Sequence, residues 1–280
     1  MIAIAGGTGR LGSLVARRLT ERGLEVRVIT RDPARAGHLR ELPVQIVTAD
    51  IRDRLGIPAA IAGTTTVISA VHGFAGPGKV SPESVDRAGN ANLIDAAAEL
   101  GVDVILMSVV GASPEHPIEL FRAKHAAERH LINSGAAWTI VRATAFVELW
   151  SEILRKPIVF GNGENPINFV SVNDVAAVVE RATLEQNQRS RVIEVGGPRN
   201  LTFNELASIL RHARGESAKV RHIPRPVLHV AARFSRQARA AIAMDTIDMT
   251  FTPRPPRPGQ PVTDPLDALE HPAARTGNRG

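Results

Sequence analysis

Short apolar runs alternate with longer amphipathic segments through the first half of the chain. The runs are rich in β-branched residues and end at glycine or polar turns, which is typical of buried strands. Between the runs, apolar residues recur at helical spacing. The predicted strands are 1–5, 24–30, 44–48, 65–69, 102–108 and 138–142. The predicted helices are the segment after the first strand, 33–39, 55–61, 85–100 and 118–133.

Strands that alternate with helices at this spacing predict a parallel sheet covered on both faces. Right-handed crossovers then give a doubly wound sheet of the Rossmann type, whose ligand lies at the carboxyl ends of the strands. We therefore expect an α/β fold with a Rossmann domain over 1–150.

The alternation loosens after Arg142. We expect a helix to begin near Ser171, a strand at 191–195, a capped helix from Thr202 and a longer helical segment over 226–249. These elements predict a small C-terminal cap on the substrate side, 151–250, partly interleaved with the Rossmann domain. Residues 251–280, rich in proline and arginine, predict a tail without regular structure.

Glycines interrupt the chain between the first strand and its helix. Gly6 permits a tight turn, Gly9 lets the backbone approach a pyrophosphate, and Gly12 lets the helix pack closely. The helix N-terminus offers unpaired N–H groups to an anion. A plain strand-to-helix turn is the alternative. The residues expected to bind a dinucleotide here are Gly6, Thr8, Gly9, Arg10, Leu11 and Gly12.

The end of the second strand bears on the choice of dinucleotide, because the adenosine ribose lies there in Rossmann folds. Arg31 is the first residue after this strand. Together with Arg10 it could bind a 2′-phosphate, because a guanidinium group binds phosphate oxygens two at a time. We therefore favour NADP(H) over NAD(H), although Asp32 could face the ribose and keeps NAD open. After the third strand, Asp50 and Ile51 are placed to meet the adenine, with a helix cap as the alternative role of Asp50.

Composition sets broad limits. The chain has 280 residues, 44% hydrophobic and 22% charged, as in ordinary globular proteins. It has no cysteine, no apolar stretch long enough to span a bilayer and no signal-peptide pattern, so we expect a cytoplasmic protein without membrane attachment. The net charge of +6 gathers between Arg211 and Arg239, where aromatics are nearly absent, so a solvated basic face is favoured over nucleic-acid binding. The oligomeric state stays open.

Several motifs resemble the NmrA-like group of atypical short-chain dehydrogenases. They are the glycine turn, Thr30-Arg31-Asp32-Pro33, Ala49-Asp50, Ser108-Val109-Val110-Gly111, Lys124 and the run from Phe169 to Ala176. The resemblance runs from residue 1 to about 230. It implies a Rossmann domain with a small cap and NADP(H) binding. Some members reduce quinones or triphenylmethane dyes, whereas others bind the dinucleotide without reducing anything.

Many short-chain dehydrogenases use a tyrosine four residues before a lysine, with a serine after the fifth strand. Here Ser108 and Lys124 are present, but position 120 is leucine and the chain contains no tyrosine. Lys124 lies in an apolar helical stripe, which is unfavourable unless a polar group meets it. We expect Lys124 to contact the cofactor ribose; the alternative is a structural pair with Glu128, one turn on.

Other candidates follow the ends of the fourth and sixth strands. Ala70 and Val71 are expected to bind the cofactor and His72 to contact substrate, although a loop histidine without a role is the alternative. Thr144 is expected beside the nicotinamide, and Phe146 against an aromatic substrate or in the core.

These residues favour an NADPH-dependent oxidoreductase that transfers hydride to a small quinone-like or conjugated acceptor. Such a reaction needs little positioned acid, so contact between donor and acceptor supplies much of the rate. A non-catalytic NADP-sensing regulator is the alternative. No residue spacing suggests a metal site.

Overall fold

A computed structural model describes residues 1–74, 80–156, 158–216, 220–252 and 263. The predicted tail over 251–280 therefore lies almost wholly outside the described residues. The chain divides into two compact units. The first comprises Met1–Arg142 and Val175–Glu194, and the second comprises Ala143–Asp174 and the described residues that follow Glu194.

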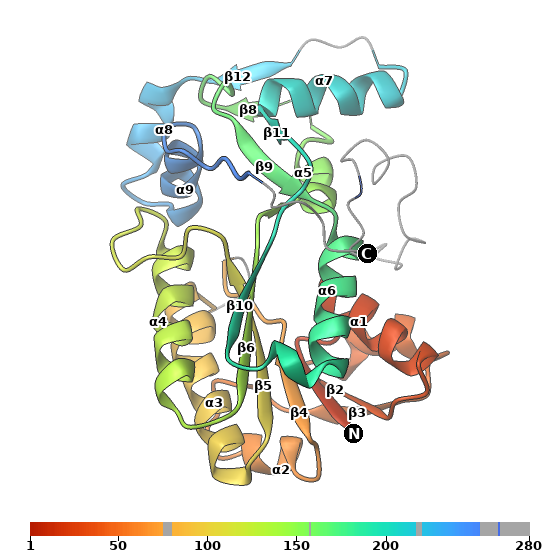
Figure 1. The fold of residues 1–280 in the computed structure, drawn as a ribbon. Helices are drawn as coiled ribbons and strands as arrows, with labels where there is room; N and C mark the ends of the chain where they lie inside the picture. The colour runs from red at the N-terminus through yellow and green to blue at the C-terminus, as the bar shows by residue number, and fades with distance from the viewer. Residues whose placement is uncertain (75–79, 157, 217–219, 253–262, 264–280) are drawn as a thin grey trace. The chain divides into compact units, whose positions relative to one another are not determined.

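The first unit is built on a seven-stranded sheet with the strand order β10-β6-β5-β4-β1-β2-β3 (Figure 1). β1 pairs in parallel with β2 and β4, and the parallel pairing continues from β2 to β3 and from β4 to β5. The order reverses between β1 and β4. The strands are β1 (Ile2–Ala5), β2 (Val26–Thr30), β3 (Val44–Thr48), β4 (Thr66–Ser69), β5 (Asp103–Val109), β6 (Trp138–Ala143) and β10 (Arg191–Val195).

Helices cover both faces of this sheet, with α3 and α4 on one face and α1 and α6 on the other (Figure 1). The helical segments are α1 (Arg10–Glu21), η1 (Pro33–Leu39), α2 (Ile57–Ile61), η2 (Pro82–Gly89), α3 (Asn90–Leu100), α4 (Glu119–Asn133), α6 (Val172–Leu184) and η3 (Gln186–Gln188). Fully buried aliphatic side chains such as Ile4, Ile68 and Leu93 form the core. The predicted Rossmann-type α/β fold is thus confirmed.

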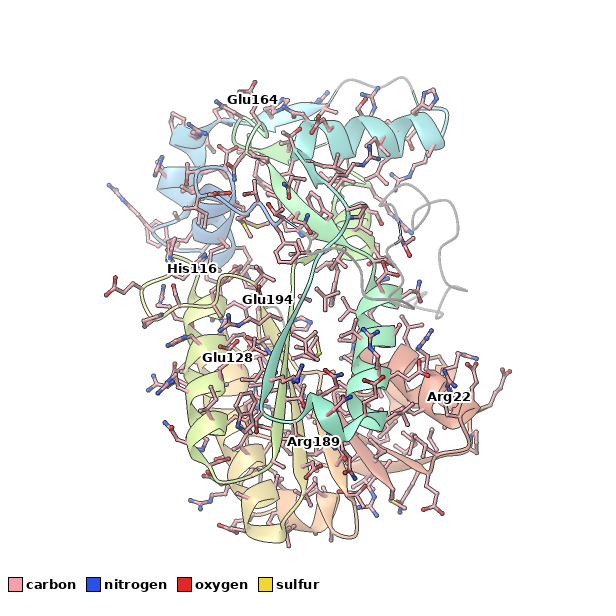
Figure 2. The ribbon with its side chains drawn as sticks, viewed as in Figure 1. Arg22, His116, Glu128, Glu164, Arg189 and Glu194 are labelled. Carbon is pink, nitrogen blue, oxygen red and sulfur yellow. The ribbon has the colours of Figure 1, made fainter. Side chains whose placement is uncertain are left out.

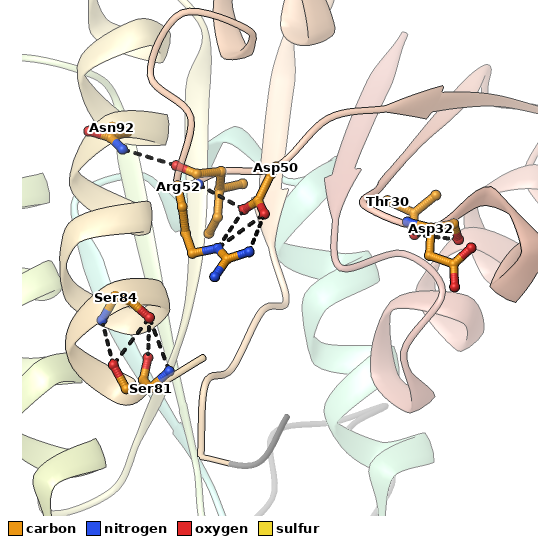
Figure 3. A network of polar contacts seen from close by, with 8 residues as sticks. Thr30, Asp32, Asp50, Arg52, Ser81, Ser84 and Asn92 are labelled. Carbon is orange, nitrogen blue, oxygen red and sulfur yellow. Dashed lines mark hydrogen bonds and ion pairs between the residues drawn. The ribbon is translucent and has the colours of Figure 1, made fainter. Parts of the chain in front are cut away.

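Two predicted helices differ from the structure. The helix expected over 85–100 begins earlier, at Pro82, and runs as π-helix through Gly89 before α3. Ser81 and Ser84 form a capping box at this start (Figure 3). The segment expected as one helix over 226–249 is two helices, because Ser235 accepts a cap bond from the Ala238 N–H and begins a new helix.

The second unit contains short elements. Its strands form a three-stranded sheet, β11-β9-β7, and a two-stranded pair, β12-β8. Thr202 and Glu205 form the capping box expected at the start of α7. The elements are β7 (Ala145–Phe146), α5 (Val147–Ile153), β8 (Ile158–Phe160), β9 (Ile167–Val170), β11 (Asn200–Leu201), α7 (Phe203–Ala213), β12 (Arg221–Ile223), α8 (Arg225–Ala231) and α9 (Arg236–Met244). Across the described part of the chain, every helix is too short or too polar to cross a membrane.

Glu180 ties α6 to α1. Its carboxylate accepts hydrogen bonds from Arg18 Nε at 2.5 Å and Arg22 Nε at 2.7 Å, and its side chain is only 6% exposed. Arg22 is labelled in Figure 2. These charge-assisted bonds join segments that are far apart in sequence, so they stabilise the packing of α6 on α1.

We expect Glu180→Ala to lower the free energy of unfolding by about 2 kcal/mol, because two hydrogen bonds to a buried charge are lost. Urea denaturation measures this change. The matched control is Glu83→Ala, which removes an exposed pair with Arg87 at 3.2 Å and should cost at most about 0.5 kcal/mol. Equal losses in the two variants would contradict a special role for Glu180.

Candidate dinucleotide site

The glycine turn after β1 is shaped by two close approaches. Gly6 has a φ of +78°, and a β-carbon there would lie 2.8 Å from the carbonyl oxygen of Ala70. A β-carbon on Gly12 would lie 2.4 Å from the carbonyl oxygen of Gly6. Only glycine is tolerated at these two positions, and the result is that α1 begins directly against the turn.

The N-terminus of α1 has room for an anion. Gly9 is its N-cap in extended conformation and, having no side chain, makes no side-chain cap hydrogen bond. A β-carbon on Gly9 would meet nothing within 4 Å except the Gly6 carbonyl oxygen, at 3.2 Å. Arg10, the first helical residue, is exposed, and Leu11 is buried. Uncapped N–H groups beside a glycine-lined space fit a pyrophosphate.

Arg31 and Asp32 directly follow the end of β2. Thr30 Oγ1 lies 3.3 Å from Thr8 Oγ1, which links this strand end to the glycine turn. The Asp32 carboxylate accepts a hydrogen bond from the Ala34 N–H at 3.0 Å and thereby caps η1. Figure 3 shows Asp32 beside Thr30. Arg31 is exposed. Asp32 is exposed as well, and its cap bond uses only Oδ1.

Asp50 and Ile51 follow β3. The Asp50 carboxylate accepts hydrogen bonds from Arg52 Nη2 at 2.6 Å and the Arg52 N–H at 3.0 Å (Figure 3). Partial burial raises the pKa of Asp50, but the bonds from Arg52 and the charges of Arg52 and Arg31 outweigh burial and lower it. Asp50 is not the cap of α2, whose N-cap is Gly56, so that alternative is wrong. Ile51 is buried, and its carbonyl oxygen accepts from Asn92 Nδ2.

Lys124 is buried on α4 and paired with an acid that the sequence did not indicate. Its Nζ lies 2.9 Å from Asp86 Oδ1 in η2, and it donates to the Val71 carbonyl oxygen at 3.0 Å. The partner suggested by helical spacing, Glu128, is wrong: Glu128 accepts two bonds from Arg142, at 2.6 and 2.9 Å. Figure 2 labels Glu128 together with Glu194, a second acceptor of Arg142.

The segment that follows β4 lies against this buried pair. Asp86 Oδ2 accepts a hydrogen bond from the Gly73 N–H at 2.7 Å, so both charged side chains contact residues 71–73. Desolvation lowers the pKa of His72; the Asp86 charge raises it, and the charges of Lys124 and Arg35 lower it. The net shift is downward, so the imidazole of His72 is more readily neutral than that of an ordinary histidine.

Ser108, near the end of β5, carries a buried hydroxyl without a hydrogen-bond partner among the described residues. Buried polar atoms are nearly always paired, so an orphaned hydroxyl is a candidate donor to a ligand. Ala70, one residue beyond β4, is the residue that the Gly6 turn approaches. Among the described residues, no group of three acidic or histidine side chains is arranged to hold a metal ion.

Thr144 and Phe146 belong to the second unit. Thr144 Oγ1 donates to Asn168 Oδ1 at 2.9 Å, and the fully buried Asn168 also bonds the main chain of Gly197. Phe146 is half-buried and opposite Val170 in the β7–β9 pairing. Sequence reasoning did not identify Asn168 or Asp86, because nothing local marks a buried polar residue whose partners are distant.

The turn, the helix that follows it and the strand order define a Rossmann fold, and proteins of this fold bind dinucleotides at the carboxyl ends of their strands. Comparison with known proteins agrees. Residues 6–186 match the model of the NAD(P)H-binding family, and the chain belongs to this family. This finding also agrees with the resemblance to atypical short-chain dehydrogenases.

Relatives of known activity and structure extend the comparison. An NAD(P)H azoreductase from Xenophilus azovorans is 30% identical over 250 residues, which cover 87% of this chain and 81% of that protein. The photosystem II assembly factor Ycf39 from Synechocystis sp. is 26% identical over 242 residues, 84% of this chain and 74% of that protein. The crystal structure of an NADPH-dependent quinone oxidoreductase from Escherichia coli, with NADPH bound, matches with a TM-score of 0.76 at 21% identity, over 97% and 99% of the two chains.

We expect Gly12→Ala to lower the free energy of unfolding by on the order of 2 kcal/mol, because the new methyl group would overlap the Gly6 carbonyl. Gly37→Ala is the control, since a β-carbon there meets nothing within 4 Å and the change should stay within about 1 kcal/mol. Urea denaturation of both variants checks the difference. A Gly12→Ala protein as stable as wild type would contradict the close approach described above.

The lowered pKa of His72 predicts a loss of stability in acid. As the pH falls below the ordinary histidine value of 6.5, the unfolded chain takes up this proton before the folded chain does. The stability is therefore present above that value and declines below it; His38 and His116 shift in the same direction. Melting temperatures from about pH 8 to about pH 5 measure the decline, and His72→Asn should make it shallower. An unchanged slope in that variant would show that His72 does not contribute.

Proposed function

We propose that this protein is an NADPH-dependent reductase that transfers hydride to a small conjugated acceptor, such as a quinone or an azo compound, without a tyrosine acid. The observation that carries the proposal is the uncapped N-terminus of α1, where Gly9 leaves room for a pyrophosphate. Membership of the NAD(P)H-binding family supports the cofactor, and the azoreductase relative supports reduction of a conjugated bond.

The preference for a 2′-phosphorylated dinucleotide rests on the groups at the end of β2. Asp32 caps η1 through one carboxylate oxygen, and Arg31, which is exposed, lies near the Asp50 carboxylate. In our proposal Arg31 and Arg10 bind the 2′-phosphate, because planar guanidinium groups take phosphate oxygens in pairs. Asp50 and Ile51 lie toward the adenine.

The cofactor would supply a hydride, and solvent would supply the proton that completes the reduced acceptor. Ser108 donates its unpaired hydroxyl to a heteroatom of the acceptor, and one of the three Lys124 N–H groups remains to bond the ribose. We assign Ala70 and Val71 to the cofactor, together with Thr144, and His72 and Phe146 to the acceptor. Because hydride addition to a quinone gives a resonance-stabilised hydroquinone anion that solvent can protonate, orientation does more here than acid catalysis.

A sensor that binds NADPH without turnover is the second candidate. The absence of tyrosine from the chain favours it, and so does the likeness to an assembly factor. Turnover separates the two candidates. The reductase should oxidise NADPH at about 1 per second or faster with at least one quinone, azo dye or triphenylmethane dye. Tight binding without oxidation by any of these acceptors would favour the sensor, and absence of binding would exclude both.

The cofactor preference is tested by reversing the charge at position 31. We expect Arg31→Asp to weaken NADPH binding by on the order of 10- to 100-fold, the effect of losing hydrogen bonds to a charged group, with little change for NADH. Arg54→Asp is the matched control, because Arg54 is exposed and makes only a distant contact with Glu99, at 3.9 Å. Calorimetric titration gives all the dissociation constants. Equal losses for the two dinucleotides would contradict a 2′-phosphate contact at Arg31.

A further inference from the structure

The buried pair between Lys124 and Asp86 is not explained by the general binding of a dinucleotide. The Lys124 side chain is 5% exposed and that of Asp86 is fully buried. Removing two charges from water is costly, and their attraction offsets that cost only with good geometry and further hydrogen bonds. The burial of this ion pair therefore needs a structural or functional explanation.

The further hydrogen bonds of the pair converge on one short segment. Lys124 Nζ donates to the carbonyl oxygen of Val71, and Asp86 Oδ2 accepts from the N–H of Gly73. The two backbone contacts flank His72 from both sides. Asp86 Oδ1 faces Lys124 as its ion partner and accepts no hydrogen bond among the described residues. Residues 71–73 are thus held at both ends by opposite charges.

Asp86 is also linked through Asn90 to Ser69, at the end of β4. Asn90 Nδ2 donates to the main-chain oxygen of Asp86 at 2.8 Å, and Ser69 Oγ bonds Asn90 Oδ1 at 2.5 Å. Asn90 is fully buried and Ser69 nearly so. Gly73 is also closely packed, because a β-carbon there would lie 2.2 Å from the Ser81 carbonyl oxygen. The backbone of residues 71–73 is therefore held by hydrogen bonds and by close packing.

The strand order shows which part of a dinucleotide would meet this segment. The adenosine half lies over β2, on one side of β1, and the pyrophosphate lies at α1. β4 and β5 lie on the opposite side of β1, and the Gly6 turn itself touches Ala70 and Val71. Residues 71–73 are consequently on the nicotinamide side of the switch point, within the same unit as the glycine turn.

We infer that Asp86 is a positioning residue for the nicotinamide half of the cofactor, acting through Lys124 and residues 71–73. This inference rests on the proposed binding of NADPH. Where a tyrosine-dependent enzyme would place a phenol four residues before the lysine, this chain has Leu120, and the acidic partner of the lysine comes from η2 instead. Asp86 needs no contact with the cofactor, because it orients the groups that make that contact.

The test compares two ligands that share one half. NADPH spans both sides of the switch point, whereas adenosine 2′,5′-bisphosphate reaches only the adenosine side. We expect Asp86→Asn, which keeps the shape but removes the charge, to weaken NADPH binding on the order of tenfold in calorimetric titration. Binding of adenosine 2′,5′-bisphosphate should stay unchanged. A purely structural role would weaken both ligands together or neither.

Two further variants complete the design. Glu83→Gln makes the same chemical change in the same π-helix at an exposed ion pair, and it should leave both affinities at the wild-type values. Asp86→Ser removes the charge with a smaller side chain, whose hydroxyl can still accept from the Gly73 N–H, and leaves Lys124 in place. It keeps the inference testable if Asp86→Asn does not fold, and it too should lose NADPH affinity selectively.

The outcomes separate the inference from the function on which it rests. If wild type binds NADPH and both Asp86 variants bind it equally well, the positioning role is overturned while the reductase proposal stands. If the variants lose NADPH and adenosine 2′,5′-bisphosphate in equal proportion, Asp86 is structural and the inference is again overturned. If wild type binds neither ligand, the proposed function itself is wrong.

Discussion

The close approach of α1 to the turn that follows β1 is the constraint on which the candidate site depends. Gly12 and Gly6 come so near that no side chain fits between them. This contact fixes where α1 begins, and the N-cap of that helix, Gly9, has no side chain to bond the first N–H groups. Because the helix dipole adds to these groups, an anion is favoured there without any positively charged side chain.

Buried or half-buried ion pairs organise the rest of the first unit. Lys124 with Asp86, Arg142 with Glu128, and the two arginines on Glu180 each join a helix to another element of the unit. Such pairs add little net stability compared with apolar packing, but removing one partner is costly. Their effect is to specify one arrangement of helices around the sheet. After the end of β4, the Lys124–Asp86 pair holds residues 71–73 in this way.

The second unit combines an apolar core, which includes Phe169, Phe203 and Leu206, with buried polar side chains. Asn168 is fully buried and bonds Thr144 and the main chain at Gly197. Asp245 is buried as well and accepts bonds from Arg225 and the Gly163 N–H. These hydrogen bonds join short strands and loops, and one of them reaches Thr144, whereas Phe146 lies in β7 and pairs with β9.

Local sequence determined the elements whose cause is local. The strands 44–48 and 191–195, the helix 33–39 and the cap at Thr202 occur where hydrophobic periodicity and capping chemistry predicted them. The glycine spacing located the turn, because conformational freedom belongs to the residue itself. The π-helical start of η2 and the break at Ser235 were not predictable, since periodicity does not distinguish the hydrogen-bond pattern within a helical segment.

Tertiary structure alone decided the partners of the charged side chains. Helical spacing suggested Glu128 for Lys124, yet the fold gave Glu128 to Arg142 and brought Asp86 to the lysine. Asp32, open to a ribose from the sequence, became a helix cap. A charge acts on whatever the packing places within a few ångströms, and a one-dimensional pattern carries no information about that distance. The sequence thus determined the class of ligand site, and the packing of helices on the sheet decided which side chains are available to it.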